Sequence, residues 1–86
     1  MKAKKAISIE VLGPGCKNCD TLYAYVRQAV DQLGAQDTIR VKKIKDIDTF
    51  IKMGVFSTPA LVIDGTVVST GRLLKPDEIV GLIQDR

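Results

Sequence analysis

Four short runs of the chain are rich in β-branched and aliphatic residues, as is typical of β-strands. They cover residues 6–12, 38–44, 60–63 and 66–69. The third run (ALVI) lacks any alternation of apolar and polar positions, which indicates a strand that is covered on both faces. Asp64 and Gly65 form a favoured two-residue turn after this run, so we expect the third and fourth strands to pair antiparallel as a hairpin.

Three other stretches carry apolar residues at helical spacing. The longest of them ends at Gly34, a residue typical of helix C-termini. Its apolar positions are Leu22, Tyr25, Val26, Ala29, Val30 and Leu33. A short helix is expected between Asp46, a typical N-cap, and Gly54. Pro76 suits the first turn of a last helix that extends to Ile83.

The predicted order of elements is βαβαββα, within a single domain that covers residues 1–86. The first strand, helix and strand form a βαβ unit, in which the two strands are parallel and the crossover is right-handed. The hairpin adds two further strands to this unit. We therefore expect an α/β fold with a mixed four-stranded sheet flanked by three helices.

The composition is typical of a folded soluble domain, since 45% of the residues are hydrophobic and 27% are charged. No apolar stretch approaches the roughly 20 residues of a membrane span. The basic N-terminal segment reaches Ser8 and Glu10 before the apolar region of a signal peptide can form. We expect a cytoplasmic protein that does not enter a membrane.

Charge and aromatic content argue against a nucleic-acid partner. The net charge is +3, and aromatic residues make up 5% of the chain, which is too few for a base-stacking surface. Lys42, Lys43 and Lys45 form the densest basic cluster, which we interpret as a solvated strand edge. The chain contains no histidine, which excludes Ser-His and Cys-His nucleophile pairs and removes the commonest metal ligand.

Cys16 and Cys19 are the two cysteines of the chain, and they fall between the first strand and the first helix. At the start of a helix, residues three apart lie on the same side, so the two sulfurs can approach to disulfide distance. The helix N-terminus and Lys17 favour a thiolate on Cys16, whereas Asp20 partly opposes it. Our hypothesis is that Cys16 is the attacking nucleophile and Cys19 the resolving thiol of a thiol–disulfide exchange.

Other uses of the two cysteines remain open at this point. They could cap the helix without any chemical role, or serve an inactive interaction module. They could also bind a soft metal such as copper or zinc. A closed zinc site needs four ligands and one chain offers two thiols, so we expect no metal site within a single chain.

The segment 13–19 (GPGCKNC) after a strand, and Thr58-Pro59 before a strand, resemble the motifs of a minimal thioredoxin fold. With this order of elements, residues 7–83 are similar to the small redox-active disulfide proteins of archaea and bacteria. The resemblance implies a thioredoxin-like fold and a cis peptide bond between Thr58 and Pro59 that faces the cysteines. It also implies that the backbone of Thr58 pairs with an extended substrate segment.

Glu10 lies six residues before Cys16, at the spacing of a buried acid in thioredoxins. By resemblance, Glu10 shuttles a proton to or from Cys19 during the exchange. The alternative is a half-exposed strand residue whose charge is balanced by a nearby lysine.

Departures from the family pattern limit what the resemblance implies. Gly15 stands where thioredoxins have a Trp, and Lys17-Asn18 replaces their Gly-Pro, so a thioredoxin-like redox potential does not follow. The glycine pair of glutaredoxins is absent around Gly71, so we do not expect glutathione to bind. We expect the Gly13–Gly15 loop, Phe56 and Gly71 to border the docking surface for the substrate, with packing in the core or in a turn as the alternative role of each. Arg72 either meets an acidic group of a partner or is a solvated loop residue.

The leading interpretation is a monomeric thiol–disulfide oxidoreductase that acts on protein disulfides, holds no cofactor and is itself reduced by a flavin-dependent disulfide reductase. The main alternative is a soft-metal binding or delivery module. Heavy-metal-associated domains also place a CxxC motif after their first strand, but their elements follow the order βαββαβ. The helix expected near the C-terminal end favours the oxidoreductase.

Overall fold

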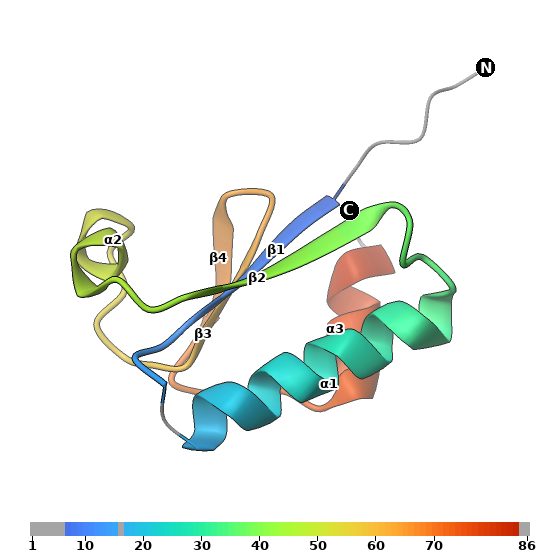
Figure 1. Cartoon of the computed structure of the whole chain (residues 1–86), viewed down its shortest axis with the longest axis horizontal. Coiled ribbons are helices and arrows are strands. Elements are labelled where there is room, and N and C mark those ends of the chain that lie inside the picture. The colour runs from blue at the N-terminus through green and yellow to red at the C-terminus, as the bar shows by residue number, and fades with distance from the viewer. Residues whose placement is uncertain (1–6, 16, 85–86) are drawn as a thin grey trace.

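The computed structural model describes residues 7–15 and 17–84. Its strands are β1 (Ile7–Leu12), β2 (Ile39–Ile44), β3 (Ala60–Ile63) and β4 (Thr66–Thr70), and its helices are α1 (Lys17–Leu33), α2 (Ile47–Lys52) and α3 (Pro76–Gln84) (Figure 1). This is the predicted order βαβαββα. Residue 6, the predicted start of the first strand, lies outside the described residues.

The four strands form one mixed sheet in the order β2-β1-β3-β4. β1 and β2 are parallel, whereas β3 is antiparallel to both β1 and β4. α1 and α3 pack against each other on one face of the sheet, and α2 covers part of the other face (Figure 1). The predicted mixed sheet with three flanking helices is therefore confirmed.

β3 lies between β1 and β4, and all four of its residues are buried. Leu61 and Ile63 belong to the core beneath α1 and α3. Ala60 and Val62 belong to a smaller core on the opposite face, together with Phe50 of α2. Because both faces of β3 are covered, no position in it has to be polar, which explains the unbroken apolar run.

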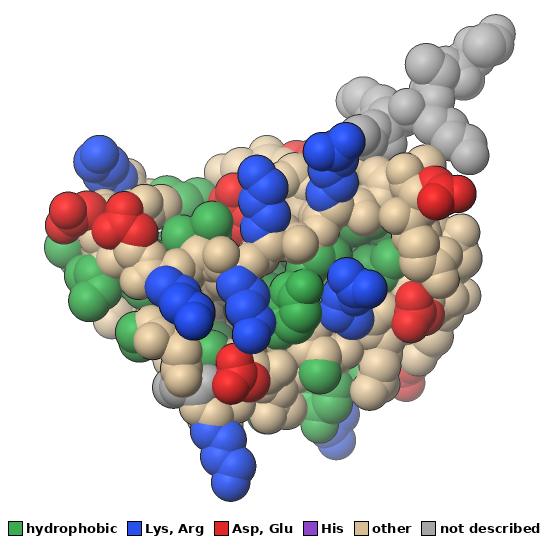
Figure 2. Space-filling view, in the orientation of Figure 1, with side chains coloured by type: hydrophobic (Ala, Val, Ile, Leu, Met, Phe, Trp, Pro, Cys, Tyr) green, Lys and Arg blue, Asp and Glu red, His purple; other side chains and the backbone are tan. Residues whose placement is uncertain are grey.

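β2 forms one edge of the sheet and carries exposed basic side chains at Arg40, Lys42 and Lys43. Figure 2 shows basic side chains spread across this face of the molecule. The Nζ atom of Lys43 lies 3.1 Å from an Asp20 carboxylate oxygen and 4.8 Å from the centre of the Tyr23 ring, both on α1. Charged side chains on an edge strand hinder its pairing with another chain. The basic cluster is therefore a solvated strand edge, as predicted.

The Asp64-Gly65 turn joins β3 to β4 and is also bound to β1. Both turn residues have positive φ, 50° at Asp64 and 81° at Gly65, as the predicted two-residue hairpin requires. The Ser8 N–H donates to the Asp64 carboxylate at 2.9 Å, and the Asp64 N–H donates to the Ser8 carbonyl at 2.7 Å. One aspartate thus holds the hairpin in register with the neighbouring strand.

Replacing Asp64 by Ala should lower the free energy of unfolding by about 1–2 kcal/mol, because Ala loses the acceptor for the Ser8 N–H and is less tolerant of positive φ. Urea denaturation of the variant and the parent measures the difference. Asp64→Asn is the matched control, since Asn keeps an acceptor oxygen and tolerates positive φ. Equal losses in the two variants would contradict this account of the turn.

Candidate active site

Cys19 lies in the first turn of α1, and its side chain is only 4% exposed. Its sulfur takes part in a disulfide bond. A buried sulfur can be reached by a neighbouring sulfur of its own chain more readily than by a partner protein. Cys16, the predicted nucleophile, lies outside the described residues.

Gly13 packs directly against Cys19. A Cβ atom at position 13 would overlap the Cys19 sulfur and would lie 2.9 Å from the Cys19 Cβ. The Gly13 N–H also donates to the Ile44 carbonyl of β2 at 2.9 Å, which fixes the backbone at this point. Position 13 therefore has room for glycine alone while Cys19 keeps its place.

Two residues further on, Gly15 has a φ of 102° and open space around the position of a Cβ atom. Glycine adopts this conformation without the steric cost that other residues meet. Glycine is thus required at the two positions for different reasons. At Gly13 it allows close packing against Cys19, and at Gly15 it allows a backbone conformation with positive φ.

The peptide bond between Thr58 and Pro59 is cis, as the resemblance implies. In the register of β1 and β3, Leu12 lies opposite Ala60. The next residue along β1 is Gly13, and the residue before Ala60 is Pro59, so both leave the sheet at the same end. The cis-proline segment therefore lies at the end of the sheet where Gly13 supports Cys19.

Gly71 contacts the same segment. Its N–H donates to the Pro59 carbonyl at 2.9 Å, and a Cβ on Gly71 would lie 3.0 Å from the Ser57 Cβ. Phe56, which precedes this segment, is 84% exposed. Residues that the sequence suggested separately, Phe56, Thr58-Pro59 and Gly71, are thus gathered at one end of the sheet.

Comparison with known proteins agrees with this geometry. A family model described as a thioredoxin domain matches residues 7–84 of the chain. The chain belongs to the thioredoxin family. Thioredoxins from Methanothermobacter thermautotrophicus and Methanocaldococcus jannaschii are 34% and 30% identical to it over 73 residues, which is 85% of this chain and 92% and 81% of theirs. The chain is accordingly a thiol–disulfide oxidoreductase of this family.

Solved thioredoxin structures share the fold. Thioredoxin-2 of the malaria parasite, described as a component of protein secretion machinery, superposes with a TM-score of 0.74 at 15% identity, over 99% of this chain and 87% of that one. A mutant thioredoxin from Halobacterium salinarum gives a TM-score of 0.66 at 24% identity, over 94% of this chain and 74% of that one. These likenesses support the fold that the strand order and helix positions define.

In this chain, Glu10 is half-buried in β1 and lies opposite Lys42 of β2 in the strand register. Within the described part of the chain, its carboxylate makes no hydrogen bond or ion pair. Both predicted roles of Glu10, the proton shuttle and the strand residue near a lysine, are compatible with this position.

Sequence reasoning missed the role of Gly13. The sequence predicts that Gly13 belongs to a loop at the border of the docking surface, and nothing in its local pattern indicates contact with a sulfur. The contact follows from the path of the chain after β1, which places the first turn of α1 against the strand end. The nearness of Gly13 to the CxxC motif was the one available signal.

Replacing Gly13 by Ala should lower the free energy of unfolding by about 1–3 kcal/mol, because the new methyl group overlaps Cys19 and the backbone is held by Ile44. Denaturation under reducing conditions measures the effect without any contribution from the disulfide.

The control is the same substitution in a Cys19→Ala background, where the sulfur is gone. There the Gly13→Ala change should cost much less, which a double-mutant cycle detects as coupling between the two positions. A loss of the same size in both backgrounds would show that the Gly13–Cys19 contact is not its cause.

Proposed function

We propose that this protein exchanges its Cys16/Cys19 dithiol with disulfides of other proteins, with Cys16 as the nucleophile and Cys19 as the resolving thiol. The observation that carries the proposal is the buried, disulfide-bonded sulfur of Cys19 at the start of α1. Cys16 stands three residues before it in the sequence, and the sequence predicts that Cys16 lies at the start of the helix, where the N-terminus favours a thiolate.

The exchange runs in two steps. The Cys16 thiolate attacks one sulfur of the substrate disulfide, that S–S bond breaks, and the first substrate thiolate leaves. The Cys19 thiol then loses its proton and attacks the Cys16 sulfur of the mixed disulfide, which releases the second substrate thiolate. Two electrons pass from the dithiol to the substrate, and the two released thiolates take up protons. The same steps in reverse oxidise a dithiol.

The substrate segment would dock at the end of the sheet that carries Thr58-Pro59. Thr58 is partly exposed, while Pro59 is buried. The backbone of Thr58 is proposed to pair with an extended segment of the substrate, as in recognition by strand addition. Gly15, Phe56 and Gly71 would border this surface, with Phe56 offering the largest exposed apolar side chain.

Cys19→Ser should trap stable mixed disulfides with protein substrates, because the resolving attack is lost while Cys16 still reacts. Cys16→Ser should trap none. Non-reducing electrophoresis after incubation with a protein disulfide, with and without added reductant, distinguishes the two variants. The reverse pattern would invert the assignment of the two cysteines.

Glu10→Gln should lower the rate of exchange by roughly ten- to hundredfold and change its pH profile, if the carboxylate takes the proton from Cys19. Asp37→Asn is the control, since Asp37 is an exposed carboxylate in the turn before β2, at the opposite end of the sheet. Identical pH profiles for Glu10→Gln and the parent would leave Glu10 as a strand residue near Lys42.

The proposal also covers the reductase, the cellular compartment and the oligomeric state of the protein. A flavin-dependent disulfide reductase would return the dithiol to its reduced state in the cytoplasm, and the protein would act as a monomer. Among the helices of the described chain, none combines the length and apolarity needed to cross a bilayer. The lysines on the β2 edge support the monomer, since they hinder edge-to-edge pairing.

Soft-metal delivery is the competing use of the two cysteines. Heavy-metal-associated domains follow the order βαββαβ, whereas this chain follows βαβαββα. A redox titration with a dithiol donor separates the two functions. A cysteine pair that does not cycle but binds copper or zinc tightly would overturn the oxidoreductase assignment.

A further inference from the structure

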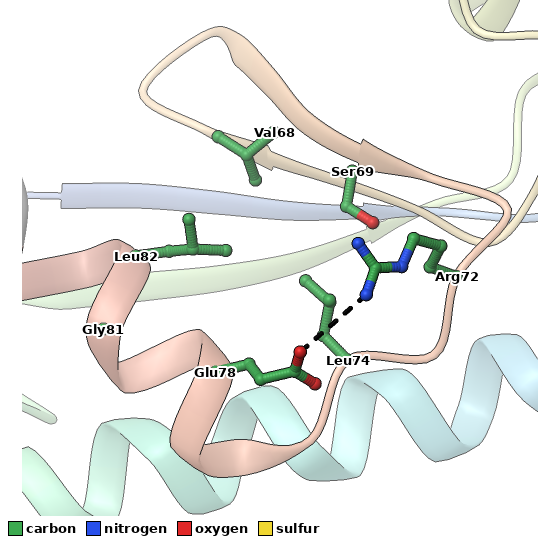
Figure 3. A pocket seen from close by; sticks show the side chains of 7 residues that line it. All are labelled: Val68, Ser69, Arg72, Leu74, Glu78, Gly81 and Leu82. Carbon is green, nitrogen blue, oxygen red and sulfur yellow. Dashed lines mark ion pairs between the residues drawn. The ribbon is translucent and has the colours of Figure 1, made fainter.

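A pocket of about 380 Å³ lies between β4 and α3. This volume is within the range of about 300–1,000 Å³ that is typical of ligand sites. Figure 3 shows Val68 and Leu82 toward one end and Ser69 and Arg72 toward the other, with Leu74 between them. The pocket therefore has an apolar end and a polar end.

An irregularity in β4 places two consecutive residues in this pocket. Ser69 lies opposite Leu61 in the strand register, but Val67 lies opposite Val62, so Val68 is an extra residue in β4. Along a regular strand, neighbouring side chains point to opposite faces. The bulge at Val68 lets both Val68 and Ser69 face α3.

Gly81 of α3 keeps the apolar end open. A Cβ atom built on Gly81 would meet no atom within 4 Å. Helix propensity favours almost any other residue over glycine at an interior helical position. Gly81 is exposed, so the pocket is open to solvent on this side and a side chain can enter it from outside.

The polar end has a hydroxyl group without a partner. The Ser69 Oγ atom is buried and makes no hydrogen bond within the described part of the chain. Buried polar atoms are seldom left in this state. A serine hydroxyl can donate or accept, and rotation about its Cα–Cβ bond would turn the Oγ atom toward the pocket, where a peptide N–H or C=O would satisfy it.

The charges at the mouth of the pocket nearly cancel. The Arg72 guanidinium lies 3.8 Å from the Glu78 carboxylate, and the two side chains are 69% and 50% exposed. One cation opposed by one anion gives little attraction for a polyanion such as a phosphate group. An uncharged peptide group suits the pair, because its C=O accepts from Arg72 and its N–H donates to Glu78.

The pocket begins beside the proposed docking site. Arg72 follows Gly71, whose N–H is bonded to the Pro59 carbonyl. An extended chain advances about 3.3–3.6 Å per residue, so a substrate paired with Thr58 needs only a few residues to reach the pocket mouth.

We propose that the pocket between β4 and α3 binds an aliphatic side chain of the polypeptide substrate, with the adjoining peptide group held by Ser69, Arg72 and Glu78. This inference rests on the proposed function, because it names the substrate class of the same site. Binding in this pocket would make the protein selective for polypeptide disulfides with an aliphatic residue near the reactive cystine.

Gly81→Leu tests the proposal by filling the apolar end from within. With a dithiol donor present, it should lower kcat/KM for insulin roughly tenfold, mainly through KM, because it removes binding rather than chemistry. Reduction of hydroxyethyl disulfide, which has no side chain for the pocket, should keep its parental rate. Gln84→Leu is the matched control, since it adds the same side chain to an exposed position of α3.

Ser69→Ala is a second test variant, which should change stability and activity in opposite directions. It should raise the free energy of unfolding, because it removes a buried hydroxyl without a partner, yet lower kcat/KM for insulin. A purely structural role would move stability and activity together.

Parental insulin kinetics in both Gly81→Leu and Ser69→Ala would overturn the pocket assignment while leaving the thiol chemistry intact. An equal loss on both disulfides would also overturn it, because the change would then act on the cysteines or the fold. Failure of the parent to reduce either disulfide would instead overturn the proposed function.

Discussion

At the end of β1, the sulfur of Cys19 occupies the space that a side chain at position 13 would need. The hydrogen bond from Gly13 to Ile44 ties this point to β2, so neither the strand end nor the first turn of α1 can shift independently. The cysteine is therefore positioned by the sheet itself. In a protein whose chemistry requires one sulfur to attack another, this fixed support sets the geometry of the site.

The sheet can hold Cys19 in place because the strands β1 and β3, which lead to the site, are well packed. β3 is buried on both faces, with Leu61 and Ile63 on one side and Ala60 and Val62 on the other. The two strands that lead into the site, β1 and β3, are the central pair of the sheet. Gly13 and the cis Thr58–Pro59 bond thus extend from the best-packed strands, while the edges carry the charged and partly exposed residues.

The sequence predicts correctly those features of the fold that depend on a few neighbouring residues. The ALVI run, the Asp64-Gly65 turn and the Asp46 cap each depend on a few neighbouring residues, and the structure contains all three. The contact of Gly13 with Cys19 depends on how a helix is placed against a strand end, which no local pattern encodes. The bulge at Val68 depends on strand register, and the sequence of β4 alone reads as a regular strand.

The size of the chain limits how it can recognise a substrate. The described residues form two apolar cores, and these use most of their large aliphatic side chains. Few large aliphatic side chains remain outside the two cores to line a deep cleft, so the proposed recognition uses the ends and edges of the sheet. The loop from Thr70 to Arg72 joins two such places, since Gly71 contacts the cis-proline segment and Arg72 borders the pocket beside α3. A single extended polypeptide would therefore reach both places.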